Sequence, residues 1–90
     1  ADPGIAAAEA LERAEKLARL KLALDRVQPK RRAVVILHDL EGLSVAEIAD
    51  IVDANPLTVR SRLRDGRRRL AEELARDPYF DDGASPREEA

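Results

Sequence analysis

Six arginines within residues 55–70 are the side chains of this chain best suited to chemistry with a ligand. The segment reads NPLTVRSRLRDGRRRL, and aliphatic residues interrupt its arginines at helical spacing. A guanidinium group can donate two parallel hydrogen bonds, either to a phosphate or to the O6 and N7 atoms of guanine. The segment therefore predicts contact with a polyanion.

Charge is strongly segregated along the chain, although the net charge is only −2. Residues 1–37 carry +3, residues 38–55 carry −5, residues 56–70 carry +5 and residues 71–90 carry −5. A local concentration of positive charge attracts a polyanion even when the whole protein is acidic. The low pI of 5.4 therefore does not argue against such a partner.

The elements that must position the arginines are predicted to be helices. Aliphatic residues dominate the apolar composition, with one Tyr and one Phe, which favours a small helical bundle over a sheet. Apolar spacing and capping residues predict helices over 3–27, 29–41, 45–52 and 56–75. The expected fold is an all-α, four-helix domain containing a helix-turn-helix and followed by a flexible acidic C-terminal tail.

Three parts of the chain are expected. Residues 1–21 form a linker or N-terminal helical extension, residues 22–75 form the helix-turn-helix domain, and residues 76–90 form an acidic tail that we expect to be disordered. In the first helix, an apolar stripe that begins at Leu17 predicts packing of the second half. The Ala-rich first half has little to bury and is expected to be looser.

The predicted turn of the helix-turn-helix lies between two capping signals. Ser44 and Glu47 form a capping box before the third helix, and Asn55 with Pro56 caps and opens the fourth. Asp53 occupies the tight turn between them. A break of this length fixes the crossing of the two helices at roughly 90–120°, so that the second helix protrudes and fits the DNA major groove.

The fourth helix has two distinct faces on a helical wheel. Val59, Leu63, Leu70 and Leu74 cluster on one side, at about 100° per residue. The opposite side and its flanks carry the polar residues and one leucine, namely Leu57, Arg60, Ser61, Arg62, Arg64, Asp65 and Arg68. The alternative interpretation is a solvated face with intrahelical ion pairs such as Arg68–Glu72 and Arg69–Glu73. The combination with the capping box and the turn favours DNA binding.

The stretch LEGLSVAEIADIVDANPLTVRSRLRDGRRRL, preceded by LDRVQPKRRAVVIL, resembles region 4 of bacterial sigma factors, particularly the extracytoplasmic-function (ECF) group. The resemblance covers roughly residues 22–74 and is carried by EGLS, EIA and TVRSRL. It implies that the last helix recognises the −35 element of double-stranded promoter DNA and directs RNA polymerase to initiate transcription. It also implies contact with the flap of the polymerase β subunit, and an anti-sigma factor is a candidate further partner.

The same resemblance assigns roles to residues of this chain. It implies base-edge or groove-edge contacts for Arg60, Ser61 and Arg64, and phosphate contacts for Arg62 and Thr58. Three residues at the start of the second helix are expected to grip the DNA backbone, unless they are ordinary solubility charges: Lys30, Arg31 and Arg32.

Several residues depart from the family pattern. Asp53 stands where Gly is usual, and Asp65 stands where a basic residue is common. The Asp65 carboxylate would repel phosphate unless it accepts from a cytosine amino group or pairs with Arg62 or Arg69. Gly66 stands where Ala is common and is expected to weaken the helix by about 0.5–1 kcal/mol.

Other chemistry is not expected. The absence of Cys and the single His exclude disulfides, thiolate chemistry and a His/Cys metal site. The apolar runs are far shorter than the roughly 20 residues that span a bilayer, and no leader opens the chain, so we expect a cytoplasmic protein without membrane insertion. The acid pairs Asp81–Asp82 and Glu88–Glu89 are not held in a catalytic geometry. We expect no enzyme, no cofactor and no metal.

Two other functions stay open. The surfaces of the first three helices favour a protein-interaction module that binds the β flap or an anti-sigma factor. A response-regulator-type effector domain has a similar helix-turn-helix but commonly dimerises, whereas we expect a monomer. Residues 1–27 are too few to form a sigma region 2, so we expect the chain to be a part of a longer sigma factor or a free-standing regulator. The acids from Glu72 onward are a candidate competitor of DNA for the arginine face.

Overall fold

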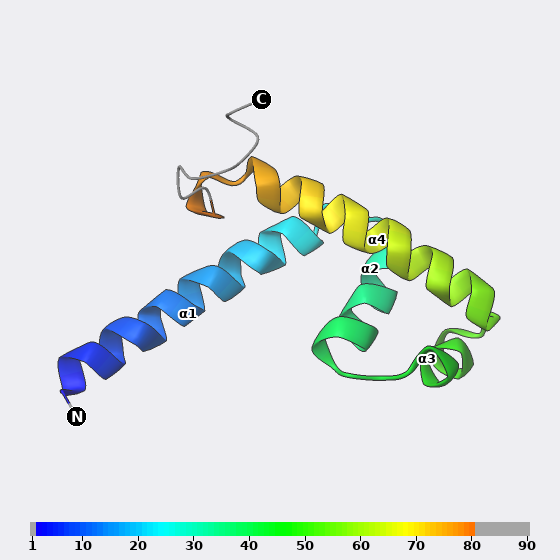
Figure 1. The fold of residues 1–90 in the computed structure, drawn as a ribbon, viewed down its shortest axis with the longest axis horizontal. Helices are drawn as coiled ribbons and strands as arrows, with labels where there is room; N and C mark the ends of the chain where they lie inside the picture. The colour runs from blue at the N-terminus through cyan, green and yellow to red at the C-terminus, as the bar shows by residue number, and fades with distance from the viewer. Residues whose placement is uncertain (1, 81–90) are drawn as a thin grey trace.

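The computed structural model describes residues 2–80 of the chain, which form helices without any strand among them (Figure 1). The predicted all-α fold with four helices is confirmed. In chain order the elements are α1 (Pro3–Leu24), α2 (Pro29–Val35), a π-helical turn (Ile36–Leu40), α3 (Val45–Val52), α4 (Pro56–Arg76) and a 3₁₀ helix (Pro78–Phe80). No helix in this described part is long and apolar enough to cross a membrane.

Helix α1 projects away from the other helices over most of its length (Figure 1). Asp2 caps it by accepting a hydrogen bond from the backbone N–H of Gly4 at 2.8 Å, and alanines sustain the exposed turns through their high helix propensity. Only its C-terminal end packs, through Leu20 and Leu24. Leu17 was expected to pack as well, but it is 64% exposed.

The second predicted helix is continuous in space but changes its winding. Its C-terminal part is π-helical, and the N–H of Glu41 donates to the carbonyl of Ile36, five residues earlier, at 3.0 Å. The wider turn inserts one extra residue relative to an α-helix. His38 and Asp39 lie in this turn and contact α4.

An aliphatic core lies where α2, α3 and α4 meet, closed on one side by the end of α1. Its buried members are Leu24, Val34, Val35, Ile48, Ala49, Val59 and Leu63. Each large side chain among them contributes about 1.5–3 kcal/mol by leaving water. This core holds the inner face of α4, so the outer face of that helix is left to solvent.

Helices α2 and α4 cross in close contact at Gly66. A Cβ atom at this position would lie 2.7 Å from Cγ2 of Val35 and 3.1 Å from the carbonyl oxygen of Arg31. Because neither neighbour is the end of a flexible side chain, the crossing requires a residue without a side chain. The glycine that was expected only to weaken α4 is therefore also a packing requirement.

The helix-turn-helix has the predicted caps. Ser44 and Glu47 form the reciprocal capping box, with hydrogen bonds of 2.9 and 3.1 Å between backbone N–H groups and side-chain oxygens. These hydrogen bonds lower the pKa of the Glu47 carboxyl. Asp53 adopts the left-handed conformation at φ 53°, and Asn55 caps α4 by accepting from the N–H of Thr58 at 2.9 Å. The turn therefore forms without the glycine that is usual there.

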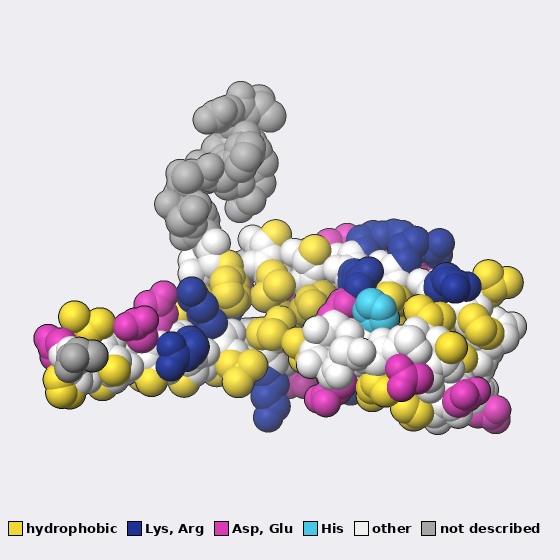
Figure 2. Space-filling model, turned by 60° about the horizontal axis from the view of Figure 1, so that its bottom comes forward, with side chains coloured by type: hydrophobic (Ala, Val, Ile, Leu, Met, Phe, Trp, Pro, Cys, Tyr) yellow, Lys and Arg dark blue, Asp and Glu magenta, His cyan; other side chains and the backbone are white. Residues whose placement is uncertain are grey.

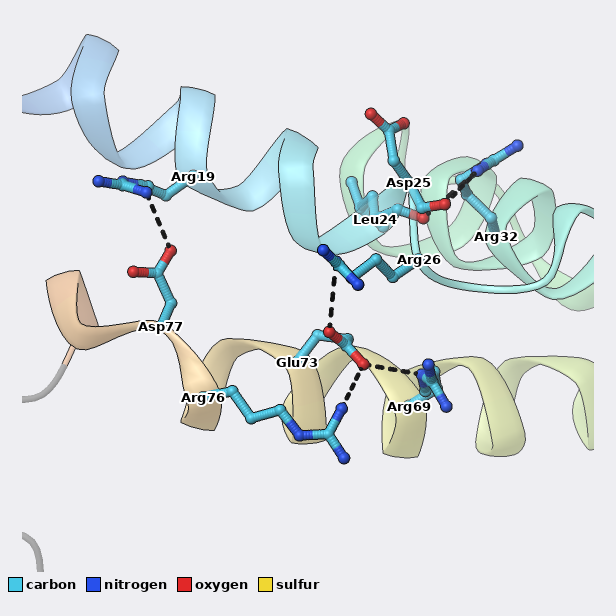
Figure 3. A network of polar contacts seen from close by, with 9 residues as sticks. All are labelled: Arg19, Leu24, Asp25, Arg26, Arg32, Arg69, Glu73, Arg76 and Asp77. Carbon is cyan, nitrogen blue, oxygen red and sulfur yellow. Dashed lines mark hydrogen bonds and ion pairs between the residues drawn. The ribbon is translucent and has the colours of Figure 1, made fainter.

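A polar network joins the ends of α1 and α4 (Figure 3). The Glu73 carboxylate is 6% exposed and pairs with Arg69 at 3.1 Å, Arg76 at 2.8 Å and Arg26 at 3.7 Å. Arg19 of α1 pairs with Asp77 at 3.8 Å. The expected Arg69–Glu73 pair is thus present. These contacts tie the C-terminal end of α1 to α4.

Helical structure continues past the expected start of the acidic tail. Arg76 still belongs to α4, and the 3₁₀ helix follows it. Within that helix, the ring of Tyr79 lies 5.7 Å from the Arg19 guanidinium and meets Phe80 edge-on at 5.2 Å. The remainder of the expected tail, 81–90, lies outside the described residues.

Candidate nucleic-acid interface

The first turns of α4 carry the arginine face. On the inner side, Val59 is fully buried and Leu63 is 7% exposed. On the outer side, Arg60 and Arg64 are exposed and Ser61 is half-buried. Lys and Arg side chains gather along α4, whereas acidic side chains gather near α3 on the opposite edge (Figure 2). The helix is thus anchored from behind and presents its guanidinium groups to solvent.

An open groove lies between the start of α2 and the first turns of α4. It is lined by Gln28, Lys30, Arg31, Asn55, Leu57, Thr58, Ser61, Arg62 and Asp65. The fold thus brings two of the three basic residues of α2 beside the predicted phosphate contacts of α4. Three cationic side chains and two hydroxyls around one groove suit an anionic backbone.

Arg32 is not part of this groove. Its Nη1 donates to the backbone carbonyl oxygens of Asp25 at 3.2 Å and of Leu24 at 3.5 Å (Figure 3). The side chain therefore binds carbonyl groups at the end of α1, of which that of Leu24 also accepts from the N–H of Val27 at 3.0 Å. The contact of Arg32 with the DNA backbone stays a prediction, and the structure places its guanidinium at the turn between α1 and α2.

Asp65 lies in the middle of the arginine face and pairs with the arginines around it. Its carboxylate accepts from Nε of Arg64 at 3.1 Å and from Nη2 of Arg68 at 3.3 Å, and Nη2 of Arg31 lies 3.9 Å away. The hydrogen bond from Arg64 is the main cause that lowers the pKa of Asp65. Of the alternatives raised for this carboxylate, pairing with Arg62 or Arg69 does not form, since the carboxylate points toward Arg64, Arg68 and α2.

The remaining predicted contacts lie at the two ends of the face. Leu57 is 73% exposed at the start of α4, where an apolar side chain can contact a thymine methyl group. Arg68 is exposed two turns beyond Arg60 and donates to Asp65, so the expected Arg68–Glu72 pair does not form. Both residues stay on the outer surface of α4.

Arg67 was not among the predicted site residues, and the fold explains its orientation. Its guanidinium donates two hydrogen bonds to Asp39, one of them from Nε at 2.9 Å, and it also contacts Nδ1 of His38 at 3.3 Å. The Arg67 hydrogen bond lowers the pKa of Asp39 to about 2. Arg67 therefore fastens α4 to the π-helical turn. On the helical wheel it falls only about 20° from Leu74, a signal that it points inward.

Within residues 2–80, no group of three or more His, Cys, Asp or Glu side chains is arranged to hold a metal ion. Every buried side-chain nitrogen or oxygen of this part has a hydrogen-bond partner. The candidate chemistry of the described surface therefore lies in the arginine face and its groove.

These features define the class of a helix-turn-helix DNA-binding domain, in which a buried scaffold presents one basic helix. Comparison with known proteins agrees. Residues 17–70 match the family model described as sigma-70, region 4. Over 57 residues the chain is 46% identical to the ECF RNA polymerase sigma factor SigE of Mycolicibacterium smegmatis, a match that covers 63% of this chain and 22% of that protein. No solved structure matches.

The chain therefore belongs to the sigma-70 region 4 family, and the resemblance to region 4 of an ECF sigma factor is confirmed. It spans about a fifth of the length of the curated relative that it matches. The family is a promoter-recognition domain of sigma factors, so the alternative of a response-regulator-type effector domain loses its support.

Proposed function

We propose that this domain recognises the −35 promoter element as part of an ECF sigma factor and so directs RNA polymerase to initiate transcription. The observation that carries the proposal is the two-sided build of α4. Val59 and Leu63 are buried behind the helix, while Arg60, Ser61 and Arg64 project from its first turns. A helix held in this way can enter the major groove with its N-terminal residues against the base edges.

The contacts divide into two groups. Arg60, Ser61 and Arg64 face outward and would read base edges, because an arginine bonds guanine bidentately. The groove beside them would hold the DNA backbone through Lys30, Arg31, Thr58 and Arg62. Backbone contacts set the register of the protein on the duplex, and base contacts supply the selectivity.

The proposed partners follow from the family. The domain would contact promoter DNA together with the RNA polymerase core, including the β flap, and would act in the cytoplasm as a monomer. Helix α1 favours an additional protein contact, since Leu11, Leu17 and Leu22 leave 56–64% of their surface exposed. An anti-sigma factor or the β flap is the proposed occupant. Retention of the chain by immobilised β flap, lost on Leu11→Lys and Leu22→Lys, would support this second contact.

Fluorescence anisotropy with labelled duplexes tests DNA recognition. A duplex selected by the chain from a randomised pool is compared with a scrambled duplex across a salt series. We expect affinity to fall linearly with log salt concentration, since each phosphate contact releases a counterion. No binding to either duplex at low salt, with helical circular dichroism intact, would refute the proposal.

Two variants separate the assigned roles. Arg64→Ala should lower affinity for the selected duplex more than for the scrambled one, because a base-edge contact contributes to discrimination. Arg62→Ala should weaken both duplexes alike and lower the salt slope by about one. Arg13→Ala is the matched control, since this exposed arginine of α1 lies outside the arginine face. Equal effects of both variants on both duplexes would contradict the roles.

A further inference from the structure

A carboxylate in the middle of a DNA-binding face repels phosphate. Its presence there is useful only if it orients the arginines around it. Asp65 contacts three of them, Arg64, Arg68 and Arg31, at 3.1, 3.3 and 3.9 Å. Its side chain is 24% exposed, whereas those of the three arginines are 47–67% exposed. The acid is thus seated under the arginines rather than beside them.

The contacts constrain the orientation of Arg64 in particular. Its Nε donates to Asp65, and its Nη2 donates to Oγ of Ser61 at 3.4 Å. The edge of the guanidinium group formed by Nε and Nη2 is therefore occupied by acceptors of the same helix. The other edge, formed by Nη1 and the second hydrogen of Nη2, is left for a ligand. Two parallel donors at this edge match the O6 and N7 atoms of guanine.

The same carboxylate weakens the attraction of the face for phosphate. Phosphate groups attract all the arginines through charge, independently of sequence. A negative charge that already accepts hydrogen bonds from Arg64 and Arg68 competes with phosphate for those donors. Base edges gain from the fixed orientation of Arg64, because less side-chain freedom is lost when the contact forms.

We propose that Asp65 is a positioning residue that raises sequence selectivity by fixing Arg64 and by lowering affinity for non-specific DNA. The inference rests on the proposed function, because it concerns the same face. Asp65 would lower the affinity for non-specific DNA, whereas the arginines raise it. Removal of the acid tightens non-specific binding but loosens discrimination.

Three substitutions separate the effect of the negative charge of Asp65 from that of the position of its acceptor oxygens. Asp65→Ala removes the charge and the acceptors, Asp65→Asn removes the charge and keeps the size, and Asp65→Glu keeps the charge on a longer side chain. Each variant is titrated against the selected and the scrambled duplex over a salt series. Asp50→Asn is the matched control, because it removes one exposed carboxylate of α3 from the same domain.

We expect Asp65→Ala and Asp65→Asn to bind the scrambled duplex more tightly than the wild type. In Asp65→Ala the ratio of the two affinities should fall by about tenfold, within the roughly 5- to 150-fold discrimination of one bidentate arginine–base contact. Asp65→Glu should bind the scrambled duplex as weakly as the wild type does, but its ratio of the two affinities should stay below that of the wild type. An unchanged ratio in Asp65→Ala, or changes matched by Asp50→Asn, would overturn the proposal.

A measurement without DNA distinguishes failure of this inference from failure of the proposed function. The Nε–H of Arg64 should exchange slowly with water in the wild type and faster in Asp65→Ala, as observed by ¹H–¹⁵N NMR. Equal exchange in both proteins would refute the positioning role even if the chain binds promoter DNA. Slow exchange in a wild type that binds no duplex would refute the proposed function, and with it the role of Asp65 in selectivity.

Discussion

Substitution of Gly66 by alanine should destabilise the domain, although alanine is the better helix former. Replacing glycine in a helix interior by alanine stabilises by about 1 kcal/mol on propensity alone. At this position the new methyl group would lie 2.7 Å from Cγ2 of Val35 and 3.1 Å from the carbonyl oxygen of Arg31. Ordinary carbon–carbon contacts are about 3.5–4.0 Å, so the helices must separate by a large part of an ångström.

The size of the effect follows from the rigidity of the two neighbours. Val35 is 1% exposed and stiff about its first torsion, and the carbonyl of Arg31 belongs to the backbone of α2. Forcing a methyl group into such packing costs about 1–3 kcal/mol. The propensity gain offsets part of this, which leaves a net loss of about 1 kcal/mol. For a domain of this size, the melting temperature should fall by about 4–8 °C.

Urea denaturation of Gly66→Ala and of three further variants checks the reasoning. Ala71→Gly on the exposed face of α4 measures the propensity difference in the same helix and should cost about 1 kcal/mol. Val35→Ala opens the crossing, so the double variant Val35→Ala/Gly66→Ala should lose clearly less than the sum of the two single losses. A stabilised Gly66→Ala protein, or strictly additive losses, would show that the crossing has room for a methyl group.

Three further predictions concern the rest of the domain. Ser44→Ala should cost about 1 kcal/mol of stability in urea denaturation, because it removes a cap of α3, whereas Ser44→Asp should retain most of it. The folded pKa of Asp39 is about 2 and the unfolded value 3.8, so the Asp39–Arg67 contact stabilises fully above about pH 5 and is lost as the pH falls toward 2. Asp39→Asn should therefore be less stable than the wild type at pH 6, by about 1 kcal/mol after solvent screening, and nearly equal to it near pH 2; an equal difference at both pH values would contradict the assignment. Glu73→Gln should lower the melting temperature at low salt by about 4–8 °C, and 1 M salt should narrow the difference, because the three arginines around Glu73 are themselves 47–71% exposed.

The parts of this fold that sequence could predict depend on neighbours in the chain. Helix caps such as Ser44 and Asn55 act on backbone groups two or three residues away, so their residue types are sufficient. The inner and outer faces of α4 follow from a 3.6-residue period. The placement of Val59 inside and Arg64 outside could therefore be predicted before the structure.

The remaining features depend on which helices meet. Asp39 and Arg67 are 28 residues apart, and no local pattern links them. Pairing of Asp65 with Arg62 or Arg69 was one alternative from the sequence, but the approach of α2 brings Arg31 to Asp65, and Glu73 engages Arg69. Leu17 completes an apolar period and is nevertheless exposed, because periodicity shows which face of a helix is apolar but not how far its partner extends.

Because α1 is attached to α4 only near its C-terminal end, a small rotation there moves its N-terminal end a long way. Its 22 residues span about 33 Å, and ion pairs with α4 involve Arg19 near its end and Arg26 just beyond it. The helix therefore acts as a lever arm whose pivot lies at Glu73 and Asp77. A tilt of about 10° at the pivot would move the far tip by about 6 Å. Weakening the pivot by salt or by Glu73→Gln should broaden the distance distribution between spin labels at Ala7 and Ala71, while the helix-turn-helix keeps its shape.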